Sequence, residues 1–239
     1  MNWRVSGVTL AVAALMAAVM VNSASALSVQ IKLSGGGAAD TIVTPDNILT
    51  GWSEFSGSQG TFTVNSVEGF AGVNVVAPEV FVTNSLNTSS STAGTLDVFI
   101  SATGLTSPVG PLNWLSTFAM NNLGGAITVT VKTFLDTADA AFSTTGGSVT
   151  ELGSYGPFTG PGLPASEADV TSASTGDPDG YSLTAWYHVV ATAAGTSDAN
   201  AHVAVPGPIV GAGLPGLMAA CGILVLLGRR RRHNKAAFA

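Results

Sequence analysis

Apolar and polar residues alternate strictly in several short stretches across the middle of this chain, and that alternation leaves few folds open. The stretches are separated by Gly-, Asn- and Ser-rich breaks and lie at residues 28–33, 61–65, 96–101, 127–132 and 181–190. Successive side chains of a β-strand point to opposite faces of a sheet, so each stretch would bury one face and expose the other. The pattern predicts an all-β fold, a single antiparallel β-sandwich or jelly-roll-like domain over residues 27–200.

The segments between these stretches contain one helical candidate and several loops. Residues 113–122 are the only short helical candidate, which Gly124 and Gly125 would end. Polar or Gly/Pro-rich loops are expected at 84–95, 144–147, 156–164 and 175–180. Residues 191–205 are interpreted as the end of the last strand followed by a spacer.

Charge is scarce and unevenly placed. Charged residues make up 9% of the 239 residues, against about 25% in an average soluble domain. Lys32 and Lys132 are the only basic residues of the middle region, which holds all fourteen acidic ones and therefore has a charge of about −12. Such a surface stays soluble and could attract divalent cations, but it repels phosphate backbones, so we expect no nucleic-acid partner.

Cysteine usage limits the chemistry further. The single cysteine, Cys221, excludes an internal disulfide framework, and with three scattered histidines it cannot build a structural zinc site. No metal and no cofactor are expected from the sequence.

The N-terminal residues 1–26 have the layout of a secretory signal peptide. Arg4 supplies the positive charge, an apolar stretch follows to Val21, and Ala24 and Ala26 are the small residues that a signal peptidase requires. Cleavage is predicted after Ala26. The alternative is an uncleaved anchor helix.

The C-terminal residues combine an apolar stretch with a basic block. Residues 209–228 contain no charge, and a helix of that length spans about 30 Å, the thickness of a bilayer core. The four arginines that follow, Arg229, Arg230, Arg231 and Arg232, would hold the tail 229–239 in the cytoplasm and leave the β domain outside. The alternative is a buried core helix of a soluble protein.

These C-terminal features resemble the PEP-CTERM sorting signal of Gram-negative bacteria. The motif consists of Val205, Pro206, Gly207 and Pro208 within a spacer at 201–208, followed by a GAGLPGL run, the apolar helix and the arginines. Gly207 stands where the usual motif has Glu, as in a variant subgroup. The resemblance implies processing by an exosortase, a transient stay in the inner membrane, and release or attachment at the cell surface, often alongside exopolysaccharide.

A second resemblance concerns the middle region. The run from Gly104 to Pro108, together with that from Phe158 to Gly162, is similar to the ectodomains of PEP-CTERM proteins. It implies a β-rich secreted domain without an established activity.

Residues able to perform catalysis are few. His188 and His202 are candidate bases, but no G-x-S-x-G elbow and no phosphate-binding loop is present. Residues 177–180 (DPDG) resemble half of a calcium loop, yet that register places Thr175 and Trp186 where carboxylates are needed, so a turn is predicted. Asp136 and Asp139 are further oxygen donors that a surface calcium site could use. We assign no catalytic residue and no metal ligand.

Exposed aromatic residues are the remaining binding candidates. Trp186 is the most interesting, because the alternation puts it on the face opposite Tyr181, Leu183 and Tyr187. The other candidates for stacking on sugar rings are Trp52, Trp114, Tyr155, Tyr181 and Tyr187. The favoured hypothesis is a non-catalytic, exosortase-sorted surface or matrix protein, associated with exopolysaccharide. The alternatives are a carbohydrate-binding module that uses exposed aromatics and a secreted hydrolase.

Overall fold

The chain folds into ten β-strands. The computed structural model describes residues 27–45, 51–72, 75, 79–162, 164–175 and 180–205, and no α-helix occurs among them, so the all-β prediction is confirmed. The strands are β1 (Ser28–Gly35), β2 (Ala38–Val43), β3 (Trp52–Gln59), β4 (Phe62–Ala71), β5 (Glu79–Ser90), β6 (Gly94–Leu105), β7 (Pro111–Asp136), β8 (Val149–Thr159), β9 (Ala165–Ser174) and β10 (Tyr181–Ala204).

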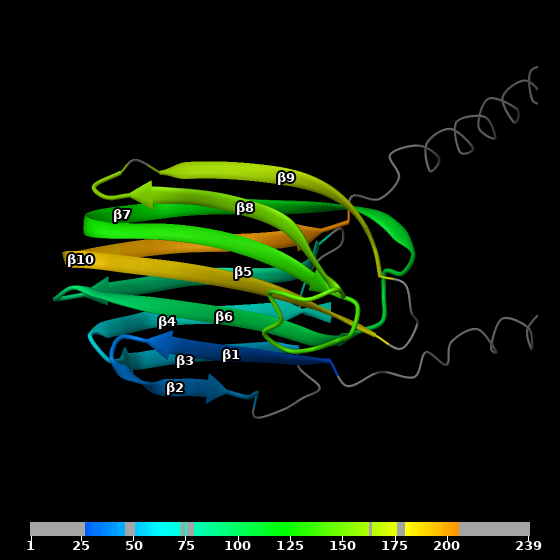
Figure 1. The fold of residues 1–239 in the computed structure, drawn as a ribbon, viewed down its shortest axis with the longest axis horizontal. Coiled ribbons are helices and arrows are strands. Elements are labelled where there is room, and N and C mark those ends of the chain that lie inside the picture. Colours follow the sequence, from blue (N-terminus) through cyan, green and yellow to red (C-terminus); the bar gives the residue numbers. More distant parts are fainter. Residues whose placement is uncertain are drawn as a thin grey trace, which may run out of the picture.

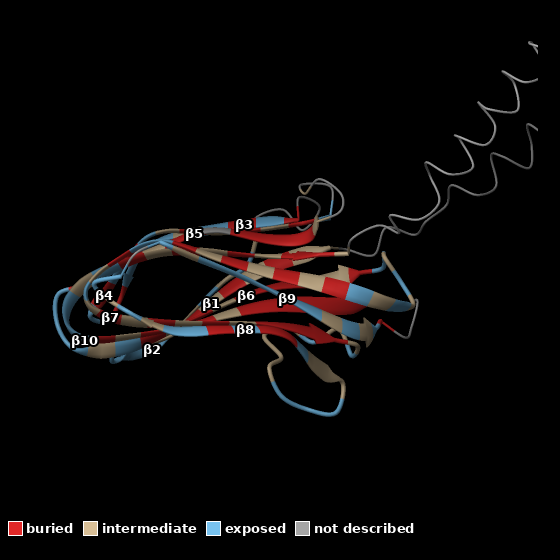
Figure 2. Cartoon of the chain, turned by 90° about the horizontal axis from the view of Figure 1, so that it is seen from above, coloured by how far each residue is buried: buried red, intermediate tan, exposed pale blue. Residues whose placement is uncertain are grey.

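The strands form two layers that face each other (Figures 1 and 2). Sheet I has the order β2-β1-β6-β10-β7-β8, and sheet II has the order β3-β4-β5-β10-β7-β9; all neighbouring strands are antiparallel. The long strands β7 and β10 belong to both sheets. Residues 181–191 of β10 pair with β6 in sheet I, and residues 195–204 pair with β5 in sheet II.

Glycines allow β7 and β10 to bend from one sheet into the other. Gly125 has a φ of 71°, and a Cβ atom there would lie 2.4 Å from the carbonyl oxygen of Ala194. A Cβ atom on Gly195 would lie 2.6 Å from the carbonyl oxygen of Gly124. Real Cβ atoms do not come so close to a carbonyl oxygen, and residues with a side chain rarely adopt the φ of Gly125. The crossing of the two bent strands therefore requires glycine.

The core is built from the inward residues of both sheets, and several of its hydroxyl groups are hydrogen-bonded to one another. Tyr187 of sheet I hydrogen-bonds to Thr83 of sheet II, and Ser116 bonds to Thr133 at 2.7 Å between the two halves of β7. Buried hydroxyls cost free energy unless they are hydrogen-bonded, so these pairs let a Thr- and Ser-rich sequence form a core. The largest fully buried side chains are Trp114, Tyr155, Tyr181, Tyr187, Phe62, Phe81, Phe118, Ile31, Leu33, Leu86, Leu96 and Ile100.

The helix expected at 113–122 is wrong, because these residues are the first half of β7. Trp114, Ser116, Phe118 and Met120 are buried and alternate with more exposed neighbours, so the segment has the period of a strand. The aromatic and branched residues within it also favour a strand.

Two expected loops and the expected spacer are shorter than predicted. The strand β5 continues through Ser90 and β8 through Thr159, although polar or breaker residues fill these segments. The strand β10 runs to Ala204, four residues into the stretch 201–208 that was assigned to the spacer and sorting motif. Ala201 and Val203 are buried there and the segment pairs with β5 and β7, so tertiary contacts extend the strand beyond its local propensity.

The two ends of the chain carry predictions that lie outside the described residues. These are the signal segment 1–26 with Ala24 and Ala26, the motif residues 206–208, the apolar stretch 209–228 and the tail 229–239. Across the described part of the chain, no helix has the length and hydropathy needed to span a bilayer. Val205, the first motif residue, follows β10 directly and packs against the core.

Candidate functional site

The outer surface of sheet I carries a stacked aromatic pair. Phe99 of β6 and Trp186 of β10 lie opposite each other in the strand register, with ring centroids 6.2 Å apart and an interplanar angle of 14°. Their sequence neighbours Val98 and Tyr187 are fully buried, so both rings point away from the core. Trp186 therefore lies on the face that the alternation predicts, and both rings are partly accessible.

Two lysines flank this pair in the same cross-strand row. Lys32 of β1 lies opposite Phe99, and Lys132 of β7 lies opposite Trp186. The Lys32 Nζ atom is 5.6 Å from the centre of the Phe99 ring, within the range of a cation–π contact. The only two basic residues of the middle region are thus brought to the two ends of one aromatic row, which we call the platform (Lys32, Phe99, Trp186 and Lys132).

Asp97 holds the platform in a fixed orientation. Its Oδ1 atom accepts a hydrogen bond from the indole Nε1 of Trp186 at 2.8 Å and another from Nδ1 of His188 at 2.8 Å. A carboxylate can only accept, so His188 is the donor in this pair. The rings of Trp186 and His188 also lie 5.6 Å apart. The indole plane is therefore set before any ligand arrives, which reduces the entropy lost on binding.

Each lysine of the platform has an acidic partner. Lys32 Nζ lies 3.1 Å from Asp40, and Lys132 Nζ lies 2.8 Å from Glu151. The hydroxyl of Ser34 donates to Asp40 at 2.7 Å, and this hydrogen bond, followed by Lys32, lowers the pKa of the Asp40 carboxyl. The two ion pairs balance the charge around the rings. Exposed ion pairs of this kind are weak, so each lysine can leave its acidic partner to contact another group.

A loop closes one end of the same face. Residues 137–148 connect β7 to β8, and the hydroxyl of Ser182 donates to the carbonyl of Ala140 in this loop at 2.8 Å. Asp139 accepts a hydrogen bond from the amide of Gly104 at 2.8 Å, while burial raises the pKa of its carboxyl. Figure 1 shows this loop in front of the sheet, beside the ends of β6 and β10. The platform is thus bounded at one end.

The carboxylates that the sequence suggested for calcium serve the loop itself. Burial raises the pKa of Asp136, but hydrogen bonds from the backbone amide of Ala138 and from nearby serine hydroxyls outweigh it, so the pKa lies below its ordinary value. Asp136 thereby caps the turn that starts the loop. Across the described residues no three His, Cys, Asp or Glu side chains are grouped so as to hold a metal ion. Residues 177–179 lie outside the described part.

The two candidate bases each pair with a carboxylate on an outer face. His188 bonds to Asp97 on sheet I, and His202 bonds to Glu79 at 2.9 Å on sheet II. Thr130 lies opposite His188 in the register, but among the described residues no hydrogen bond joins a Ser or Thr hydroxyl to either imidazole. Each imidazole is therefore paired with an acid, and we assign no nucleophile to either pair.

The remaining aromatic candidates divide by burial. Trp114, Tyr155, Tyr181 and Tyr187 are fully buried and build the core, where Trp114 contacts Tyr181 edge-to-face. Trp52 remains 37% exposed. The sequence had marked Trp186 but missed Phe99 and Asp97, because only the pairing of β6 with β10 brings them beside it.

The comparisons with known proteins identify no family. No protein-family model matches the chain, and no curated protein matches it. A solved structure of TmCBM61 in complex with beta-1,4-galactotriose is similar over 65% of this chain and 88% of its own, with 9% identity and a TM-score of 0.33. A structure from a study of carbohydrate-binding modules of the β-sandwich superfamily is similar over 75% and 84%, with 12% identity and a TM-score of 0.30. The active domain of tailspike protein 4 of bacteriophage CBA120 is similar over 65% and 19%, with 15% identity and a TM-score of 0.35. Likenesses at this level assign no ligand to this chain.

Proposed function

We propose that the β domain binds polysaccharide on the outer face of sheet I, with Phe99 and Trp186 as the surface on which sugar rings stack. The observation that carries this proposal is the oriented aromatic pair, whose indole is held by Asp97 at 2.8 Å. Aromatic faces pack against the apolar faces of pyranose rings, and the neighbouring lysine, carboxylate and imidazole groups can hydrogen-bond to sugar hydroxyls. No reaction is assigned to the site.

We further propose that the whole chain is an exported surface or matrix protein that an exosortase sorts. The support is the joint presence of the signal-like segment 1–26, a polar β domain and the tail with Pro206, Gly207, Pro208, an apolar stretch and four arginines. A polysaccharide-binding domain delivered outside the cell would meet exopolysaccharide there.

Affinity electrophoresis tests the binding proposal directly. The full-length chain is run through gels that contain one polysaccharide each, and binding retards its migration. Trp186→Ala should weaken binding by about tenfold, since an aromatic contact contributes up to about 1.4 kcal/mol beyond its buried area. Trp186→Phe keeps a ring for stacking and should lose less. Val170→Ala is the matched control, because Val170 is 67% exposed on β9, away from the platform.

The outcome is decisive in both directions. Equal retardation of Trp186→Ala and the unaltered chain would disprove the platform as the binding site. Far-UV circular dichroism and thermal unfolding of each variant separate loss of the contact from loss of the fold.

The sorting proposal is tested by fractionation. Deleting residues 205–239 should release the exported precursor from the membrane fraction of the producing cell. A truncated precursor that still sediments with membranes would show that the tail has been misinterpreted.

A further inference from the structure

A second stacked aromatic pair lies on the outer face of sheet II. Trp52 of β3 and Phe70 of β4 are opposite each other in the register, with ring centroids 6.4 Å apart and an interplanar angle of 29°. Trp52 is 37% exposed, which makes it one of the most accessible large apolar side chains of the described residues. The Trp–Phe arrangement of the platform is thus repeated on the other sheet.

The direction of this second pair is set by its neighbours. A Cβ atom on Gly69 would meet the side chains of Ile100 and Val29 in sheet I, so this position faces the core. Ser53, the neighbour of Trp52, is 3% exposed and also faces inward. Because side chains alternate along a strand, Trp52 and Phe70 point outward, away from sheet I.

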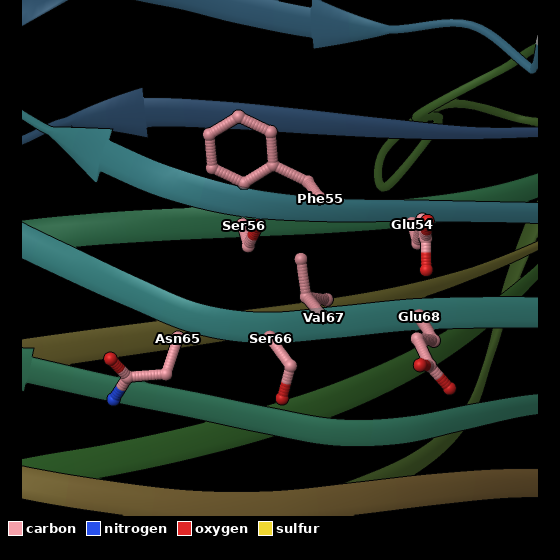
Figure 3. Close-up of a pocket in the computed structure, with 7 residues that line it drawn as sticks. All are labelled: Glu54, Phe55, Ser56, Asn65, Ser66, Val67 and Glu68. Atoms are coloured by element: carbon pink, nitrogen blue, oxygen red, sulfur yellow. The ribbon is translucent and has the colours of Figure 1, made fainter.

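A hollow of about 450 Å³ continues this face along β3 and β4. Glu54 and Glu68 lie at one end of the hollow and Asn65 lies at the other (Figure 3). Glu54 and Glu68 are two residues from Trp52 and Phe70 on the same strands, so the hollow and the aromatic pair form one surface. Asn65 donates to the side-chain oxygen of Asn87 at 2.8 Å, which places amide groups at the end of the hollow that lies away from the carboxylates.

The hollow arises from irregular pairing of β4. The register of β4 against β5 shifts on both sides of Ser66, and that of β3 against β4 shifts between Phe55 and Gly57. Bulges bend a strand and redirect its side chains, which opens the surface between the two strands.

We propose that this surface of Trp52, Phe70, Glu54, Glu68 and Asn65 is a second binding site for polysaccharide, and that the domain bridges two polymer strands. The proposal rests on the proposed function of the platform and extends it to a ligand class, uncharged polysaccharide. Carboxylate and amide groups beside an aromatic pair can accept from and donate to sugar hydroxyls while the rings stack.

The charge of sheet II favours an uncharged ligand. Its outer face holds Glu54, Glu68 and Glu79, and no Lys or Arg of the described residues lies on it. Acidic polymers would be repelled from this surface and, at longer range, from a domain with a charge of about −12. A neutral polymer meets no such barrier at either site.

Because of their geometry, the two sites bind different polysaccharide chains. The sheets of a sandwich pack about 10 Å apart, and the two aromatic pairs point in opposite directions from them. One extended sugar chain cannot lie against both faces at once. Two sites on one domain therefore join separate chains, and their linkage raises the overall avidity without any new contact.

Titration calorimetry with the full-length chain and soluble neutral oligosaccharides tests the number of sites. We expect two oligosaccharides of similar affinity per chain for the unaltered protein. In Trp52→Ala and Trp186→Ala, one site should keep its affinity and the other should bind about tenfold more weakly. Trp52→Phe should restore the second site in part, and circular dichroism verifies folding. Binding of one oligosaccharide, lost in Trp186→Ala and unchanged in Trp52→Ala, would overturn the second site and leave the proposed function intact. Absence of binding to every neutral sugar would overturn the second site and the assigned ligand class, and absence of binding to any polysaccharide, neutral or acidic, would overturn the proposed function as well.

Light scattering with a long neutral polysaccharide tests the bridging. The unaltered chain should raise the scattering to a maximum at an intermediate ratio of protein to polymer, and each single variant should abolish that maximum while it still binds. An unaltered chain that binds two oligosaccharides without this maximum would exclude bridging. Acidic polysaccharide bound as tightly as neutral would exclude the assigned ligand class. Sedimentation of the protein alone identifies self-association as a separate cause of scattering.

Discussion

Both outer faces of the sandwich carry a stacked Trp–Phe pair, but the charges around the two pairs differ. On sheet I, Phe99 and Trp186 lie at the centre of the sheet, between two lysines, and the indole is held by Asp97. On sheet II, Trp52 and Phe70 lie at the margin, beside two opposed carboxylates. The first pair is charge-balanced and oriented in advance, whereas the second includes the more exposed Trp52 and lies beside two carboxylates that no lysine of the described residues balances.

A chain with so few charges still makes two electrostatically distinct surfaces. Both lysines of the middle region are placed on sheet I, so sheet II keeps an uncompensated negative charge. The acidic surface costs some stability through repulsion, while the balanced one does not. A site can therefore be built with or without local ion pairs, and each choice has a measurable consequence.

The largest expected effect concerns the bend that makes both faces from the same strands. Gly125→Ala would force a side chain into a left-handed backbone conformation and against the carbonyl of Ala194, 2.4 Å away. We expect a loss of about 2–4 kcal/mol in the free energy of unfolding, measured by denaturant titration. Gly147→Ala is the matched control, since its Cβ atom would meet nothing within 4 Å. An unchanged stability would show that the two faces do not depend on this bend.

A smaller effect is expected from removing Asp97, which orients the Trp186 indole on sheet I. Asp97→Ala leaves the indole of Trp186 and the imidazole of His188 without their acceptor, and should weaken polysaccharide binding by about fivefold. Asp97→Asn retains a carbonyl oxygen for the indole and should bind nearly as well as the unaltered chain. If Asp97→Ala binds normally, the indole does not need to be oriented in advance.

The acidic pair on sheet II should respond in the opposite direction. Glu54→Gln removes one of two carboxylates that face each other directly across β3 and β4, and should raise the free energy of unfolding by about 0.5 kcal/mol. Repulsion is screened at 1 M salt, where the Debye length is about 3 Å, so the gain should shrink there. Glu151→Gln is the control on sheet I, and should lower stability slightly because it loses the pair with Lys132. A gain that persists at high salt would contradict the electrostatic explanation.

The smallest effect is expected at the loop that bounds the platform. Burial raises the pKa of Asp139 in the folded protein, so the folded state binds more protons than the unfolded state. Stability then falls as the pH rises from the ordinary carboxyl pKa through the raised one. Asp139→Asn should remove that dependence and leave stability at neutral pH equal or higher by about 0.5 kcal/mol, since Asn also tolerates the φ of 54° at this position. Thermal unfolding at pH 4 and pH 7 measures this pH dependence. An Asp139→Asn variant that is less stable than the unaltered chain at pH 7 would contradict the raised pKa of Asp139.

The alternation of residues was enough to predict the class of fold and the outward direction of Trp186, because side-chain direction along a strand depends only on parity. The signal-like and tail segments are likewise local properties of charge and hydropathy, and they stay predictions. The helix expected at 113–122 failed because its buried residues recur with a period of two, as pairing with β9 and β10 requires.

The composition of both sites came from the cross-strand register alone. Phe99 and Trp186 are 87 positions apart in the chain, and Lys32 and Lys132 are 100 apart, yet strand pairing places all four in one row. No local pattern contains that information, since the register is set by bulges, by the bend at Gly125 and by the burial of both inner faces. Single residues and their faces could thus be predicted from local sequence, whereas their partners were fixed by long-range pairing.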